Sequence, residues 1–362
     1  MIAIVVIVIL QLIVNTYYST ILLTSAVAIS YTTSLVMIGL LTQKFLTWFR
    51  SNKRWVVLIY GVSFAVLFID LAFALSLTIN LLGANPAQIW PHYGVLTPIG
   101  SGIKTGSITE ILNQAYVLFS IVSFAAMWLA TALLLYSHSL RLGRLRYWLV
   151  LCSPLVFFLS QFVTVLLNVF VPLIESDPVF FSIFFTMVFS LTKPAGGILF
   201  GIAFWAIARN IPNRPIIRDR ILISAWAFVF LFISSQANTL FSSPYPPFGL
   251  VTVSFLSLSS YLLLTGIYSS AIAISEDASL RKEIRKSILN DSRFLESISR
   301  AQLDMEMQNR VSSIVKKHKI DNIIKAEQDA TIESSLDDDA AKRYLLEVMD
   351  EILKKKDKMR KV

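Results

Sequence analysis

The chain of 362 residues is poor in cysteine, histidine and charge. It contains one cysteine and three histidines, and only 15% of its residues are charged. A single cysteine, Cys152, excludes a disulfide within the chain and does not support a cysteine-based metal site. His92, His138 and His318 are far apart in the sequence, so a histidine metal site is not expected. We expect no metal and no cofactor.

The chain also lacks the short motifs of common catalytic sites. It has no His-Glu-x-x-His and no Gly-x-Ser-x-Gly sequence. The segment that begins Gly100-Ser-Gly-Ile-Lys-Thr is not a phosphate-binding loop, because its lysine does not directly follow a glycine. These absences disfavour an enzyme, and we expect no catalytic residues.

Long apolar runs are what the chain has in abundance. Its residues are 55% hydrophobic and its mean hydropathy is +0.66, which indicates lipid as the solvent. A helix needs about 20 apolar residues to cross a bilayer. Residues 1–14 are short for a crossing, so we expect an all-α bundle of seven spans, or eight if they cross too. The seven runs are residues 21–48, 54–82, 112–138, 147–173, 179–208, 221–241 and 249–275.

Basic residues before position 276 are gathered between these runs. Eleven of the thirteen lie in three short stretches on alternate connections. Such stretches mark the cytoplasmic side of a membrane protein. We therefore expect a multi-pass protein of the cell membrane with these stretches and the chain's last segment in the cytoplasm. The stretches contain Lys44, Arg50, Lys53 and Arg54; Arg141, Arg144 and Arg146; and Arg209, Arg214, Arg218 and Arg220.

The composition changes at Glu276, which divides a 1–275 membrane bundle from a charged 276–362 tail. The bundle holds 13 basic and 5 acidic residues, or +8, whereas the tail holds 19 and 18, or +1. The excess charge therefore faces anionic lipid headgroups, and we expect no nucleic-acid partner. A basic cluster just after the last span is the candidate headgroup site; it consists of Arg281, Lys282, Arg285 and Lys286.

The tail as far as Lys317 has no proline or glycine and carries an apolar stripe at helical spacing. We expect a long amphipathic helix that continues from the last span, then a polar linker at 318–334 and a final helix at 335–356. An apolar stripe needs a cover, which is a second copy, the final helix or another cytoplasmic protein. The stripe includes Leu280, Ile284, Ile288, Leu295 and Ile298.

Two ionisable residues lie deep in apolar runs. Asp70 and Lys193 are sixteen and fifteen residues from the cytoplasmic ends of their expected spans, a similar depth of roughly 22–24 Å. An isolated charge at such a depth is costly, so we expect the two to pair. The pair either locks two helices together or lines an ion or substrate pathway.

Pro194 follows Lys193 directly, and Gly196 and Gly197 come next. A proline inside a helix removes a backbone donor, which predicts a kink or a partly unwound turn at this depth. Exposed carbonyls there could coordinate a cation, as in transporters with broken helices. Alternatively, the kink is ordinary and the glycines allow close helix packing.

Four stretches resemble an uncharacterised multi-span family that is frequent in ammonia-oxidising archaea. The resemblance spans the bundle and the start of the tail. It implies seven spans and a helical cytoplasmic tail, and it implies no activity. The stretches are Asn15-Thr-Tyr-Tyr-Ser, Lys193-Pro-Ala-Gly-Gly-Ile-Leu-Phe-Gly, Ser243-Pro-Tyr-Pro-Pro-Phe-Gly and Leu280-Arg-Lys-Glu-Ile-Arg-Lys-Ser.

Together these features predict a non-enzymatic sensor or receptor-like relay that couples the bundle to a cytoplasmic amphipathic helix. A transporter or channel that uses Asp70, Lys193 and the break at Pro194 is the main alternative. An accessory or scaffold subunit of a membrane complex is the third.

Overall fold

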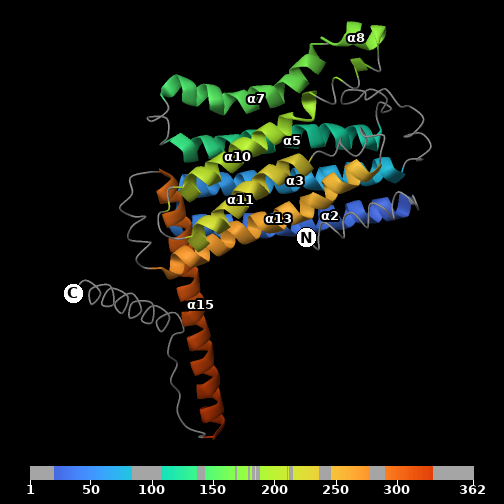
Figure 1. Cartoon of the computed structure of the whole chain (residues 1–362). Helices are drawn as coiled ribbons and strands as arrows, with labels where there is room; N and C mark the ends of the chain where they lie inside the picture. Colours follow the sequence, from blue (N-terminus) through green and yellow to red (C-terminus); the bar gives the residue numbers. More distant parts are fainter. Residues whose placement is uncertain are drawn as a thin grey trace.

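The computed structural model shows a helical bundle from which one long helix projects (Figure 1). Every regular element in the described part of the chain is a helix. The structure describes residues 20–83, 107–136, 143–167, 169–177, 180–181, 184, 188–209, 211, 215–235, 246–277 and 290–328.

Nine helices follow one another in these ranges. Seven are long helices of the bundle, α8 is a single short segment, and α15 is the projecting helix (Figure 1). They are α2 (Thr20–Asn52), α3 (Trp55–Gly83), α5 (Ile108–Leu135), α7 (Arg144–Leu166), α8 (Val171–Ser176), α10 (Thr192–Arg209), α11 (Pro215–Ser234), α13 (Pro246–Glu276) and α15 (Asn290–Gln328).

Five of these helices are long and apolar enough to cross a membrane by length and composition. They are α2, α3, α5, α7 and α13. Two expected spans fall outside this set, because α10 has 18 residues and includes Lys193 and Arg209, and α11 has 20 residues and includes Arg218, Asp219 and Arg220. The all-helical class is thus confirmed, whereas the number of spans stays a prediction.

The bundle helices run side by side, with α7 at one edge and α2 and α13 at the other (Figure 1). Neighbours in the bundle include α2 with α3 and α13, α3 with α5, and α11 with both α10 and α13. One end of the bundle carries Lys44, Arg50 and Arg54 of the first basic stretch, the start of α7 and the end of α10; we call it the basic end.

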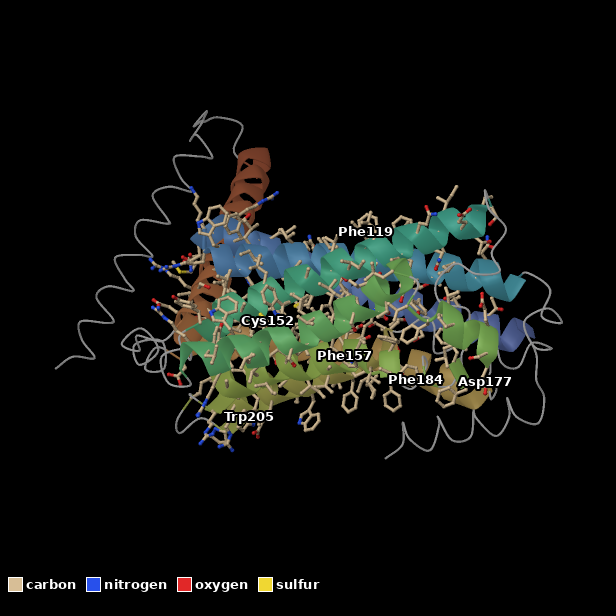
Figure 2. The ribbon with its side chains drawn as sticks, turned by 90° about the horizontal axis from the view of Figure 1, so that it is seen from above. Phe119, Cys152, Phe157, Asp177, Phe184 and Trp205 are labelled. Atoms are coloured by element: carbon tan, nitrogen blue, oxygen red, sulfur yellow. The ribbon has the colours of Figure 1, made fainter. Side chains whose placement is uncertain are left out.

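Large apolar side chains also cover the outer surface of the bundle. Trp205 and Phe184 point away from the ribbon in Figure 2, and they are 48% and 37% exposed. An apolar surface of this extent is what lipid-facing helices present. Other exposed apolar side chains are Ile29, Leu118, Val156, Ile198 and Trp226.

Local hydrogen bonds fix where α2 ends and where α5 begins. Lys53 adopts a positive φ of 48°, and its amide donates to the Phe49 carbonyl at 2.7 Å, which closes the last turn of α2 before α3 begins. At the start of α5, the Ser107 side chain accepts a hydrogen bond from the Glu110 amide at 3.2 Å. Thr109 then donates to Asn80 at 2.9 Å and ties this end of α5 to the end of α3.

Close approach of backbones joins α10, α11 and α13. A Cβ on Gly201 of α10 would lie 2.7 Å from the Ala225 carbonyl oxygen of α11. Gly266 of α13 similarly faces Ser224 and the Arg220 carbonyl of α11. Small residues at such contacts let membrane helices pack tightly, because no side chain separates their backbones.

Gly201→Ala should therefore lower the free energy of unfolding by about 1–3 kcal/mol, because the added methyl meets backbone that cannot rotate away. Denaturant unfolding in detergent micelles measures this. Gly39→Ala is the matched control, since its Cβ would meet the ring of Phe68, a partly exposed side chain, at 3.3 Å. Equal losses in the two variants would contradict tight packing at Gly201.

The tail differs from the sequence prediction in two ways. The last span does not continue into the tail as one helix: α13 ends at Glu276, Asp277 is not helical, and α15 begins at Asn290. The polar linker expected from residue 318 is wrong as far as Gln328, since α15 extends to that residue. Polar composition alone does not end a helix when proline and glycine are missing.

Candidate functional site

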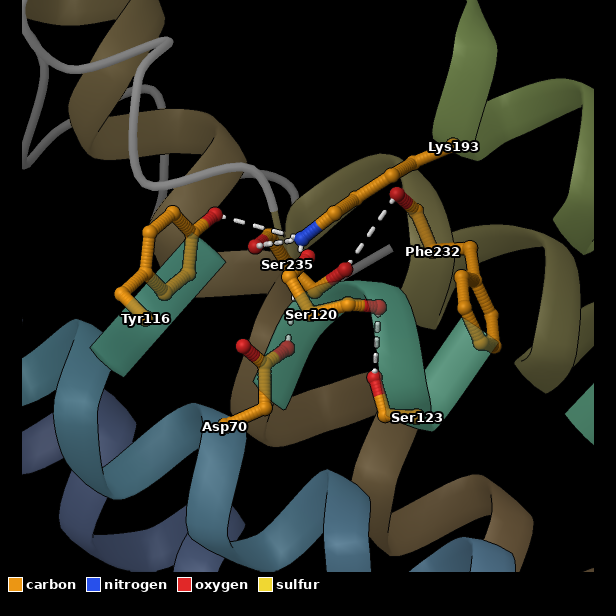
Figure 3. A network of polar contacts seen from close by, with 7 residues as sticks. All are labelled: Asp70, Tyr116, Ser120, Ser123, Lys193, Phe232 and Ser235. Atoms are coloured by element: carbon orange, nitrogen blue, oxygen red, sulfur yellow. Dashed lines mark hydrogen bonds and ion pairs between the residues drawn. The ribbon is translucent and has the colours of Figure 1, made fainter. Parts of the chain in front are cut away.

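Asp70 of α3 and Lys193 of α10 face each other inside the bundle (Figure 3). The Lys193 Nζ lies 3.9 Å from Asp70 Oδ2. Both side chains are buried, with exposed fractions of 2% for Asp70 and 7% for Lys193. The structure thus brings together the two charges that the sequence places at a similar depth, at an ion-pair distance too long for a direct hydrogen bond.

Lys193 has further polar partners from two other helices. Its Nζ donates to the Tyr116 hydroxyl at 3.2 Å and to the Ser235 carbonyl oxygen at 3.5 Å. The same Nζ lies 5.1 Å from the centre of the Tyr116 ring, within cation–π range. Figure 3 shows the ammonium between Tyr116, Ser235 and Asp70. Four helices therefore meet at one cation: α3, α5, α10 and the end of α11.

This ion pair lies far from the basic end. Asp70 is fifteen residues from the first residue of α3, and Lys193 is sixteen residues from the last of α10. At 1.5 Å per residue these are distances of about 22 and 24 Å. Ser235 directly follows the last residue of α11. Backbone carbonyls at the C-terminal end of a helix lack amide partners, so they attract cations such as the Lys193 ammonium.

A hydrogen-bonded turn interrupts the helix directly before α10: the Leu191 amide donates to the Val188 carbonyl at 3.3 Å. Ser190 and Leu191 form a turn, and α10 begins at Thr192. Pro194 is then the third residue of a helix, where its missing amide proton leaves no hydrogen bond unmade. Of the kink and the unwound turn that the sequence allows, the structure has the turn, so the expected 179–208 span is not a single helix.

The two glycines after Pro194 lie at helix contacts. A Cβ on Gly196 would overlap the ring of Phe124 on α5. A Cβ on Gly197 would lie 2.8 Å from the Cβ of Phe232 and 3.2 Å from the Phe228 carbonyl oxygen, both on α11. Both glycines follow Lys193 by less than two turns of helix, and their lack of a side chain lets α10 pack closely against α5 and α11. They serve helix packing alone.

At the basic end, the first turns of α15 are built into the bundle. Phe294 is 3% exposed, and its ring centre lies 6.3 Å from that of Phe45, 5.5 Å from that of Tyr60 and 6.2 Å from that of Phe204. These three aromatics come from α2, α3 and α10. Leu295 and Ile298, expected to need a separate partner, are buried in the same core. The chain's own bundle covers them.

Polar bonds to α2 hold α15 in register. The Trp48 indole donates to Gln302 Oε1 at 3.2 Å, and Asn52 Nδ2 donates to the Ser297 carbonyl at 3.1 Å. The Ser51 hydroxyl donates to Asp304 Oδ2 at 3.1 Å. Beyond these contacts α15 extends away from the bundle, and its 39 residues give a length of about 58 Å (Figure 1). We call Phe294–Asp304 the docked segment of α15.

Other expected residues lie outside the described part of the chain. The lipid cluster Arg281, Lys282, Arg285 and Lys286 does, and so do Leu280, Ile284 and Ile288 of the stripe. Among the described residues, no group of three or more His, Cys, Asp and Glu side chains is placed to hold a metal ion.

Sequence reasoning missed three contributors to these contacts. Tyr116 and Ser235 sit in apolar or hydroxyl-rich surroundings that give no sign of a buried lysine nearby. Phe294 belongs to the tail stripe, but an amphipathic pattern does not say which surface covers it. The one signal in the sequence is the position of Tyr116. It lies eight residues after the start of α5, at the end of the bundle opposite the basic end, and so on the same side as the ion pair.

Comparisons with known proteins add no assignment: the chain matches no family model, no curated protein and no solved structure.

Proposed function

We propose that the protein is a seven-span, non-enzymatic relay of the cell membrane, with the basic end and α15 in the cytoplasm. Alternating basic stretches support this orientation. The lengths of α10 and α11, about 27 and 30 Å, match the hydrocarbon core and support their counting as spans. The stretches that resemble the uncharacterised multi-span family support the same arrangement.

The docked segment of α15 is the observation that carries the relay. Phe294 packs against three aromatics, and two of them lie on α3 and α10, the helices that bear Asp70 and Lys193. A shift of α3 against α10 at the ion pair therefore moves side chains that hold α15. Because packed interfaces switch between discrete arrangements, such a shift changes the position of α15, which runs across the basic end roughly perpendicular to the bundle helices (Figure 1).

The relay predicts that neutralising the ion pair moves α15. Spin labels at Gln43→Cys on α2 and Ser312→Cys on α15, both exposed positions, report their separation in a Cys152→Ser background. The Asp70→Asn/Lys193→Met variant keeps the net charge of the pair and should shift or broaden the distance distribution measured by pulsed electron resonance.

Tyr147→Phe is the matched control for this measurement. It removes a buried hydrogen bond at the basic end, from the Tyr147 hydroxyl of α7 to the Ala132 carbonyl of α5 at 2.8 Å, and leaves the ion pair and the contacts of Phe294 in place. Its distribution should equal that of the parent. Identical distributions in all three proteins would rule out coupling between the ion pair and α15.

The turn at Ser190–Leu191, which interrupts the helix, favours a second candidate, a transporter or channel. The turn precedes Lys193 at the depth of Asp70, where broken helices bind ions in transporters. This candidate predicts ion flux through reconstituted vesicles that Asp70→Asn abolishes. The relay predicts no flux in either protein.

The part of α15 beyond the docked segment is the proposed contact for a cytoplasmic partner or a second copy. It is helical as far as Gln328 and projects from the bundle (Figure 1), and its side chains at Asn309, Ser312 and Ser313 are exposed.

A further inference from the structure

One side chain of α15 beyond the docked segment is buried. Val311 is 2% exposed, whereas its neighbours Arg310 and Ser312 are exposed. Met305 is the last described residue of α15 that packs against the apolar core of the bundle. Val311 follows it by six residues, and at 3.6 residues per turn it is turned about 120° away from Met305. Helix α15 therefore has a second buried face, separate from the docked one; we call it the Val311 face.

The residues that cover the Val311 face belong to this chain, because the structure consists of one chain. Among the described residues, the apolar core that buries Phe294 does not extend to Val311. The two stretches that flank α15 in the sequence are the candidates for the cover: residues 278–289 before it and 329–362 after it.

Charge distinguishes these two stretches. Residues 310–319 of α15, which include Val311, hold four basic residues and no acidic one, a net charge of +4. Residues 278–289 hold four basic residues and one acidic residue, or +3, so α15 would repel them. Within the last stretch, residues 337–351 hold two basic and six acidic residues, or −4. Complementary charge therefore favours residues 329–362 as the cover.

The same stretch has the apolar stripe and the length that the contact needs. Four of its apolar residues recur at spacings of four, three and four, which places them on one face of a helix. Val311 lies 17 residues, or about 26 Å, before the end of α15, and a helix over residues 335–356 is about 33 Å long. Residues 329–334 leave a connection of ordinary length for two antiparallel helices. The stripe consists of Ala341, Leu345, Val348 and Ile352.

We infer that the Val311 face is a docking surface for the chain's own final helix, residues 335–356, which folds back along α15. The apolar stripe of the final helix covers Val311, and its acidic residues lie beside Lys316 and Lys317. The surface thus fits an amphipathic helix of acidic character. A cytoplasmic partner of α15 needs the same chemistry and competes with the final helix for this face. The inference holds whether or not the ion pair is coupled to α15.

Exchange of amide hydrogens in the purified full-length protein tests this docking. In detergent micelles, residues 335–356 should exchange slowly in the parent protein. Val311→Asp places a charge in the apolar contact and should speed their exchange by about tenfold or more, because it releases the final helix. Ser312→Asp is the matched control: it adds the same charge at an adjacent, exposed position and should change the exchange little. Fast exchange of residues 335–356 in the parent, or equal exchange in the two variants, would overturn the inference.

Spin labels at Ser312→Cys and Lys342→Cys in a Cys152→Ser background give a second measurement, which does not depend on the folding of Val311→Asp. A narrow distribution of short distances supports docking within one chain, and a broad distribution contradicts it. A mixture of two singly labelled proteins should give no such distances; if it does, a second copy provides the cover and the inference is wrong. Failure of the relay would leave these outcomes unchanged, since it concerns the response of α15 to the ion pair.

Discussion

Lys193→Met is expected to lower the free energy of unfolding by about 3–5 kcal/mol, because it leaves Asp70 charged and buried without its cation. The substitution keeps the length and apolar character of the lysine stem, so packing changes little. Unfolding of the purified protein in detergent micelles, followed by circular dichroism, measures the loss.

Two comparisons make the Lys193→Met result specific. Adding Asp70→Asn should restore much of the stability, since the remaining groups are neutral. Lys44→Met should cost less than about 1 kcal/mol, because Lys44 at the basic end is only partly buried and its described contact is the face of Tyr268 at 4.7 Å. A loss at Lys193 no larger than at Lys44 would show that the buried pair does not hold α3 to α10.

Phe294→Ala is expected to have an effect of similar size, about 3–5 kcal/mol, on the docking of α15. The ring fills a space between α2, α3 and α10, and alanine leaves a cavity there. The docked segment should then exchange its amide hydrogens far faster, whereas the core of the bundle should keep its protection. Hydrogen exchange with mass spectrometry resolves the two regions.

Asn309→Ala provides the control on the same helix, since Asn309 is exposed beyond the docked segment. Its exchange pattern should match that of the parent. Unchanged exchange of the docked segment in Phe294→Ala would mean that the aromatic contacts do not anchor α15, and the relay would lose its physical basis.

Sequence alone was sufficient for the helical class and for most helix positions. An apolar run predicts a helix without knowledge of what packs against it, because its length reflects the immersion of one helix in lipid. The placement of Asp70 near Lys193 could be predicted for the same reason: depth follows from counting residues along a helix of known rise. Depth does not give rotation, so the roles of Tyr116 and Ser235 required the structure.

The start of α10 and the path of α15 were beyond the sequence. Residues before Lys193 are as apolar as those after it, so hydropathy does not reveal the turn at Ser190–Leu191. The stripe through Leu295 and Ile298 predicts a buried face but not the surface that buries it. Nor does the sequence reveal the break after Glu276, because the segment that follows contains no proline or glycine.

Labelling of single cysteines in intact cells tests the membrane arrangement on which the whole account rests. In a Cys152→Ser background, Ser176→Cys lies near the end of the bundle opposite the basic end, Ser51→Cys lies at the basic end, and Ser312→Cys lies on α15; all three positions are exposed. A membrane-impermeant maleimide should label the first in intact cells and the other two only after permeabilisation. Labelling of Ser51→Cys or Ser312→Cys from outside, or equal labelling of all three, would contradict a bundle that crosses the membrane with its basic end and α15 in the cytoplasm.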